Sequence, residues 1–237
     1  MKILISLAIC ACAWAQVQRP QIGKMLDANG AVRTVYGIAS SVTLGAAEIT
    51  DVLSSGCSNA LCLAKTDAGI VSASGIAPTP AGPALFAFDG ATAWVWFTES
   101  RQLAQWSNGT LALEPRPSEA VSVRDPYGEV LSIGASSGSV QFVVRRFKGD
   151  VWIVNQDGSV AGALPRAAGA VMLIPGGAVY ATRSGIAIHN LEIPLEGVTA
   201  FSWMSASYLQ VRAGGSIYAL RIDPGRETLF QLPGVQQ

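Results

Sequence analysis

One segment of the sequence matches a motif of nucleophilic catalysis. Residues 134–138 read GASSG and fit the G-x-S-x-G turn of α/β-hydrolases, in which Ser136 would be the nucleophile. Asp150, Asp157 and His189 follow in the order that the triad of such an enzyme requires. That turn leads from a strand into a helix, whereas residues 134–138 join two strand-like runs and no helical pattern follows. We therefore interpret the segment as a hairpin loop.

His189 is the only histidine of the chain. As a general base it would need a carboxylate or hydroxyl partner, and only Glu192 is close to it in sequence. The alternation in residues 186–193, IAIHNLEI, puts His189 on the face opposite Ile186 and Ile188. We predict that His189 is a solvent-facing or rim residue.

The carboxylates lie mostly at predicted turns, where an Asp side chain binds nearby backbone amides. No D-x-[DN]-x-[DN]-G calcium loop occurs. A pair of carboxylates could support glycoside hydrolysis, but the sequence places no pair at the required separation. We predict no catalytic residue, no metal ligand and no cofactor. The residues considered are Asp51, Asp67, Asp89, Glu99, Asp125, Glu129, Asp150 and Asp157.

Cys57 and Cys62 lie close together in the run SSGCSNALCLA. An even pair of cysteines in an exported protein favours a disulfide. The enclosed loop is short, so the bond would fix a local turn rather than join distant parts of the chain. A Cys/His zinc site is disfavoured because the chain has one histidine.

The N-terminus, MKILISLAICACAWAQ, has the three parts of a secretory signal peptide. Lys2 supplies the positive charge, residues 3–12 form a short apolar run, and residues 13–15 read AWA, a typical cleavage site. We predict a signal peptide over residues 1–15 and a mature protein that begins at Gln16.

A lipoprotein signal is the alternative, because Cys10 and Cys12 each follow an apolar stretch. Ile9 stands before Cys10 where a small residue is expected, and Cys10 itself stands two positions before Cys12. We therefore expect export to the periplasm or the medium without a lipid anchor.

Charge and hydropathy disfavour two kinds of partner. Sixteen Lys and Arg balance sixteen Asp and Glu, and Arg145, Arg146 and Lys148 form the only tight basic group. A nucleic-acid surface usually needs a stronger basic patch. Beyond the N-terminus no stretch is long and apolar enough to be a membrane helix. We expect a protein or small-molecule ligand, no nucleic acid and no membrane span.

A hairpin pattern recurs along the chain. Each copy has an apolar-rich run, a turn with Gly at or near Asp or Asn, and a second run that ends in Pro or Gly; such turns suit hairpins. The copies are residues 23–37, 62–75, 103–115, 150–165 and 217–234, with a weaker one at 186–195. Further strand-like pairs precede several copies, at residues 84–98, 129–147, 170–182 and 199–212.

A pair followed by a hairpin makes a four-stranded meander, and repetition of this unit is typical of a β-propeller. We predict an all-β chain with one propeller domain over residues 16–237, of five full blades plus the hairpin 23–37. That hairpin would complete a sixth blade or pair with the C-terminal blade. The alternative is a pair of β-sandwich domains. Residues 77–83, APTPAGP, are interpreted as a loop between blades rather than as a domain linker.

Residues 89–109, DGATAWVWFTESRQLAQWSNG, resemble a blade of the streptogramin-lyase and NHL-type propellers, and residues 150–165 resemble it in part. The resemblance implies a propeller fold, in a family that includes both enzymes and binding modules. Streptogramin lyases use two catalytic histidines and an acidic residue around a magnesium ion, whereas this chain has only His189. The resemblance therefore extends to the fold and not to the lyase chemistry.

The aromatic residues fall in strand-like runs. Trp94 and Trp96 share one face of their strand and Phe97 takes the other. We expect most aromatic side chains to pack between blades and one or two to line a ligand-binding mouth. Two functions remain open: an exported, non-enzymatic binding propeller, which the sequence favours, and an extracytoplasmic lyase or hydrolase on the same scaffold.

Overall fold

The computed structural model describes residues 19–39, 41–113 and 127–234. Within these ranges the chain forms 23 β-strands, and no helix is present that could cross a membrane. The expected signal peptide, residues 1–15 with Cys10 and Cys12, lies outside the described residues.

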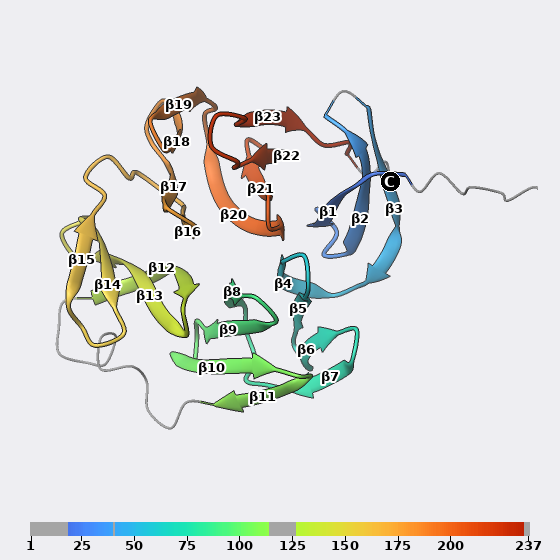
Figure 1. Ribbon diagram of the computed structural model, residues 1–237, viewed down its shortest axis with the longest axis horizontal. Coiled ribbons are helices and arrows are strands. Elements are labelled where there is room, and N and C mark those ends of the chain that lie inside the picture. Colours follow the sequence, from blue (N-terminus) through green and yellow to red (C-terminus); the bar gives the residue numbers. More distant parts are fainter. Residues whose placement is uncertain (1–18, 40, 114–126, 235–237) are drawn as a thin grey trace, which may run out of the picture.

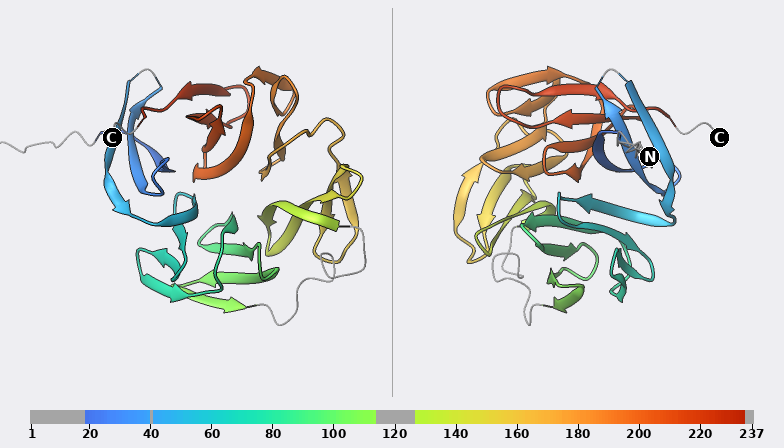
Figure 2. Two further views of the ribbon diagram at one scale, coloured as in Figure 1. Left: turned by 180° about the vertical axis from the view of Figure 1, so that it is seen from behind. Right: turned by 45° about the vertical axis from the view of Figure 1, so that its right-hand side comes forward.

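The strands form six antiparallel sheets, which are the blades of a β-propeller around a central axis (Figures 1 and 2). Blade 1 has three strands and the other five have four. Blade 1 consists of β1 (Gln21–Leu26), β2 (Val32–Ile38) and β3 (Ser41–Ile49). Blade 2 consists of β4 (Val52–Cys57), β5 (Cys62–Thr66), β6 (Gly69–Ser72) and β7 (Gly75–Pro78). Blade 3 consists of β8 (Ala84–Asp89), β9 (Thr92–Phe97), β10 (Gln102–Ser107) and β11 (Thr110–Leu113).

The remaining strands form blades 4 to 6. Blade 4 consists of β12 (Tyr127–Ser136), β13 (Ser139–Arg146), β14 (Val151–Asn155) and β15 (Val160–Ala163). Blade 5 consists of β16 (Val171–Ile174), β17 (Gly177–Ala181), β18 (Gly185–Ile188) and β19 (Leu191–Pro194). Blade 6 consists of β20 (Val198–Ser205), β21 (Tyr208–Ala213), β22 (Ser216–Arg221) and β23 (Thr228–Gln231). In each blade the first strand lies nearest the axis and the last at the outer edge (Figure 1).

The propeller prediction is confirmed, and the hairpin at residues 23–37 lies in a sixth blade, one of the two predicted placements, whereas the hairpin at residues 62–75 occupies another position than predicted. Residues 23–37 belong to the inner strands of blade 1, and β3 (Ser41–Ile49) is the outermost strand of that blade in the part of the chain that the structure describes. Residues 62–75 form the middle pair of blade 2 rather than its outer pair. The turn chemistry is the same at both places in a blade, so the turn alone does not say which pair it joins.

Six apolar clusters hold the ring together, one between each pair of neighbouring blades. Between blades 3 and 4, the rings of Trp96 and Phe142 meet edge to face with centroids 5.5 Å apart. Trp94 also faces blade 4, and Phe97 packs toward blade 2, so the predicted alternation is confirmed. Each such side chain contributes about 1.5–3 kcal/mol on burial.

Two inner-strand serines tie neighbouring blades together. The pairing register shifts between Val52 and Ser54 in β4, and again between Val130 and Ser132 in β12. Ser54 Oγ accepts a hydrogen bond of 2.9 Å from the amide of Ala84 in the next blade. Ser132 Oγ accepts one of 3.2 Å from the amide of Leu173. These hydroxyls serve the packing of the ring.

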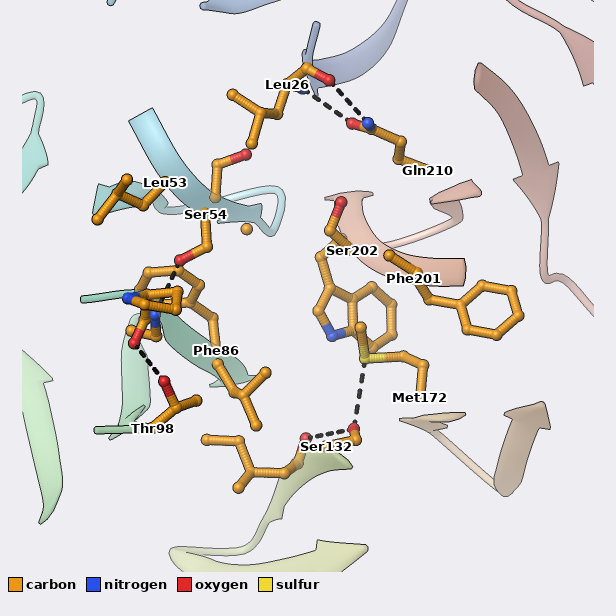
Figure 3. Close-up of a pocket in the computed structure, with 18 of the residues that line it drawn as sticks. Leu26, Leu53, Ser54, Phe86, Thr98, Ser132, Met172, Phe201, Ser202 and Gln210 are labelled. Carbon is orange, nitrogen blue, oxygen red and sulfur yellow. Dashed lines mark hydrogen bonds between the residues drawn. The ribbon is translucent and has the colours of Figure 1, made fainter. Parts of the chain in front are cut away.

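The ring closes between blades 6 and 1 without exchange of a strand, because every described sheet consists of strands consecutive in sequence. Gln210, on β21, replaces part of the missing backbone pairing. Its Oε1 accepts a hydrogen bond of 2.8 Å from the Leu26 amide, and its Nε2 donates one of 2.7 Å to the Leu26 carbonyl (Figure 3). Gln210 is 2% exposed and Leu26 is half-buried, so both bonds are largely shielded from water.

Charged groups extend this contact, which we call the closure clamp: Gln210, Arg212, Asp27 and Arg33. Arg212 Nη2 donates to the carbonyls of Leu26 and Asp27, at 2.8 and 3.0 Å. Burial lowers the pKa of Arg212, and the Asp27 carboxylate opposes that shift. Asp27 Oδ2 accepts a bond of 2.7 Å from Arg33 Nε.

Candidate functional site

The inner strands enclose a narrow central channel with a cavity volume of about 270 Å³ (Figure 3). Its lining is mainly apolar, with Leu53, Phe86 and Met172 drawn from three different blades. The polar side chains in it are largely committed to the fold: Ser54 and Ser132 bridge blades, and Gln210 belongs to the closure clamp. The channel therefore offers few free groups for chemistry.

A larger cavity of about 920 Å³, which we call the mouth, opens at one end of this channel. It is lined by the turns between the first and second strands of blades 2 to 6. Ile133 and Trp203 line both cavities, so they form the floor of the mouth where it meets the channel. The turn residues that line the mouth are 57–60, 89–90, 136, 139, 174–177 and 206.

The lining of the mouth is mainly apolar, with several polar groups and almost no charge. Among the described residues that line it, Asp89 carries the only ionisable side chain apart from the bonded Cys57. Asp89 Oδ2 accepts a hydrogen bond of 2.8 Å from the amide of Gly138, so this carboxylate already joins the turns of blades 3 and 4. The remaining polar groups are hydroxyls and amides, including Ser136 and Gln141. This surface is suited to a ligand that presents neutral hydrogen-bonding groups.

The rim of the mouth carries the disulfide. Cys57 and Cys62 face each other across the β4–β5 hairpin, with Cα atoms 4.0 Å apart, and the structure joins their sulfur atoms. Ser58 Oγ accepts hydrogen bonds from the amides of Ala60 and Leu61 and thereby shapes the tip. The disulfide thus fixes a hairpin that forms one side of the mouth.

Replacing Cys57 and Cys62 together by serine is expected to lower the free energy of unfolding by about 2 kcal/mol, the closure entropy of so short a loop. Urea denaturation of the protein lacking residues 1–15 measures this. The same preparation, denatured without reductant, should show no free thiol. Two reactive thiols in exported protein would contradict the bond.

The structure separates the residues of the possible hydrolase triad. Ser136 ends β12 and lines the mouth, and residues 134–138 form a strand-to-strand hairpin. His189 lies in the turn between β18 and β19, and its Nδ1 is 2.9 Å from Oε1 of Glu227. Asp157 accepts hydrogen bonds from Ser159. The interpretation of GASSG as a hairpin loop is confirmed.

The Glu227 partner of His189 was missed from the sequence, which offered only Glu192. A hydrogen bond from its own backbone amide, together with His189, lowers the pKa of Glu227. Glu192 instead accepts hydrogen bonds from Thr182 and Ser184, and these hydroxyls lower its pKa. His189 and Glu227 therefore link the outer parts of blades 5 and 6, away from the mouth lining.

Among residues 19–39, 41–113 and 127–234, no three His, Cys, Asp or Glu side chains gather where they could hold a metal ion. The residues of the mouth that sequence reasoning missed lie in five separate turns. Their common sequence signal is small and turn-forming residues, such as Gly90, Gly176 and Gly177.

No known family model and no curated protein matches the chain in sequence. Solved structures match it at low identity. PorZ, an essential surface component of the type-IX secretion system of Porphyromonas gingivalis, is 12% identical over 90% of this chain and 31% of its own, with a TM-score of 0.45. AztD of Citrobacter koseri is 12% identical over 89% and 69%, with a TM-score of 0.43.

Hydrazine synthase of Kuenenia stuttgartiensis is 14% identical over 90% of this chain and 80% of its own, with a TM-score of 0.44. The chain thus spans about a third of the PorZ structure. Similarities of this size carry no argument about function, and the assignment of the propeller rests on the strand pairing described above.

Proposed function

We propose that this protein is an exported, non-enzymatic binding module that takes its ligand at the mouth of the propeller. The observation that carries the proposal is the mouth itself, a cavity of about 920 Å³ to which five blades contribute turns. Ligand sites in proteins are typically concave, of about 300–1,000 Å³, with apolar walls and a few polar groups. The mouth has this size and this composition.

The placement of the reactive side chains supports binding rather than catalysis. General acid–base chemistry needs a titratable group within hydrogen-bond reach of the reacting atoms. The carboxylate of the mouth, Asp89, is already bonded to Gly138, and His189 is paired with Glu227 on the outer strands. Ser136 lines the mouth without either residue as a described hydrogen-bond partner.

Export is supported by the disulfide of Cys57 and Cys62, since such bonds persist mainly in oxidising compartments. The signal peptide over residues 1–15 is part of the proposal. The blade that resembles the streptogramin-lyase and NHL-type propellers is blade 3, at residues 89–109. We propose that the protein shares the scaffold of that group and not the magnesium-dependent chemistry of the lyases.

Replacing Ala161 by tryptophan tests the site. Ala161 is an exposed residue of β15 that lines the mouth, so a bulky side chain there would occupy the cavity without entering the core. A ligand found by thermal-shift screening of small molecules, peptides and oligosaccharides should raise the Tm of the wild type and not that of A161W. The matched control is A163W, on the same strand and outside the lining.

Two results would contradict the proposal. Equal stabilisation of the wild type and A161W would place the ligand elsewhere on the molecule. Conversion of the bound ligand to a product, detected by mass spectrometry after incubation with the wild type, would show that the protein is an enzyme.

A further inference from the structure

The mouth extends outward as a slot between blades 4 and 5. Gly134, Gln141 and Asn155 pair across β12, β13 and β14 and therefore share one face of blade 4. A Cβ atom on Gly134 would lie 2.9 Å from the side chain of Leu173, so this face is directed at blade 5. All four residues line the mouth.

Gln141 and Asn155 are held in one orientation by a chain of hydrogen bonds. Asp157 Oδ1 accepts a bond of 2.6 Å from Ser159 Oγ, because an ionised carboxylate only accepts. Ser159 Oγ in turn accepts from Asn155 Nδ2 at 2.9 Å. Asn155 Oδ1 then accepts from Gln141 Nε2, also at 2.9 Å. Among the described residues no group donates to Gln141 Oε1, so it can accept from a ligand, and each amide nitrogen keeps a second proton to donate.

The opposite wall of the slot is apolar side chains of blade 5 followed by a glycine-containing turn. The turn from Ile174 to Gly177 lines it, and Gly177 has an ordinary φ angle. A Cβ atom added to Gly177 would meet nothing within 4 Å. The fold therefore does not require glycine here, and a side chain at this position would project into free space beside the slot.

The chemistry of the slot selects an uncharged ligand rich in hydroxyl groups. Side-chain amides and the hydroxyls of Ser136 and Ser139 both donate and accept, as sugar hydroxyls do. The strands β13 and β14 are paired on both sides, so no backbone edge is free there to receive a peptide strand. Phe88 and Trp203 add aromatic surface to the same cavity, which suits the apolar faces of sugar rings.

We propose that the slot between blades 4 and 5 binds a neutral oligosaccharide, with Gln141 and Asn155 as its hydrogen-bonding wall. This inference rests on the proposed function and names its ligand class. Within the described lining Asp89 is the only carboxylate, and it is bonded to the amide of Gly138, so the charge of these residues favours a neutral sugar.

The test is calorimetric titration of the protein lacking residues 1–15 with hexamers of α-1,4-glucose, β-1,4-glucose, β-1,3-glucose and N-acetylglucosamine. At least one should bind. Gln141→Ala and Asn155→Ala should each weaken that binding about tenfold, the usual loss for a hydrogen bond. Gly177→Phe should abolish it. Gln231→Ala, an exposed glutamine on the outer strand β23, is the matched control and should bind as the wild type does.

The outcomes separate the inference from the proposed function. Tighter binding of a hexamer of galacturonate would overturn the neutral class. Failure of all four neutral hexamers, or Gln141 and Asn155 variants that bind them normally, would overturn the saccharide slot. If an uncharged peptide or small molecule is then found whose binding A161W removes, the proposed function stands. If A161W affects no ligand of any class, the proposed function fails as well.

Discussion

Replacing Gln210 by alanine is expected to lower the free energy of unfolding by about 3 kcal/mol, because the Leu26 amide loses its acceptor and the Leu26 carbonyl loses one of its two side-chain donors. The Leu26 amide donates to Gln210 Oε1 and would be left without an acceptor. The Leu26 carbonyl would keep only Arg212 Nη2. Chemical denaturation followed by tryptophan fluorescence measures the change.

The matched control is again Gln231→Ala. The Gln231 side chain is exposed and bonds only to Ser216 Oγ, at 3.3 Å, so its removal should change the stability by less than about 0.5 kcal/mol. An equal effect of both substitutions would show that Gln210 has no special role in joining blade 6 to blade 1.

Asp27→Asn is expected to cost about 3 kcal/mol at neutral pH, since it removes the charge of a fully buried side chain that has an ionic partner. Asp27 Oδ1 accepts from the amides of Asn29 and Ala31, and Oδ2 accepts from Arg33 Nε. In asparagine one of these two oxygens becomes an NH₂ group, which would face either the two backbone amides or Arg33 Nε, all of which are donors themselves. The side chain of Asp27 is 0% exposed, so water cannot compensate.

The Asp27 effect should depend on pH. Burial alone would raise the pKa of the Asp27 carboxyl. The hydrogen bonds from Arg33, Ala31 and Asn29 lower this pKa by more than burial raises it, so the net pKa lies below the ordinary value. A carboxyl whose pKa is lower in the folded state stabilises above the unfolded pKa, near 3.8, and loses this contribution as pH falls through the folded pKa.

Urea titrations between about pH 2 and 7 should therefore show the difference between wild type and Asp27→Asn at full size near neutrality and shrinking in acid. Asp150→Asn is the control, because Asp150 is exposed and its side chain makes no hydrogen bond among the described residues. A difference that stays constant down to the lowest pH would contradict the assigned role of the charge.

The fold was largely readable from local pattern. The inner pairs at 84–98, 129–147, 170–182 and 199–212 correspond to the first two strands of blades 3 to 6. Blades 1 and 2 were harder, because the Asp67 turn joins middle strands and the outer strand β7 is only GIAP. Such a short run, ending in Pro78, carries no alternation from which a strand could be recognised.

The mouth could not be predicted to the same extent. Its lining comes from turns of five blades, and their convergence depends on how the blades pack. The closure clamp shows the same limit, because Gln210 lies 184 residues from its partner Leu26. No sequence pattern predicts which distant backbone groups a buried glutamine in a strand will bind.

The closure without strand exchange has a consequence for the order of folding. Because every described sheet is built from consecutive strands, each blade can pair its strands through short-range contacts alone. Only the seam between blades 6 and 1 joins the two ends of this series, and closing so long a loop carries the largest entropic cost. The seam is therefore the contact expected to form last and to open first. Cleavage of the chain in a loop between two other neighbouring blades would leave every described sheet intact.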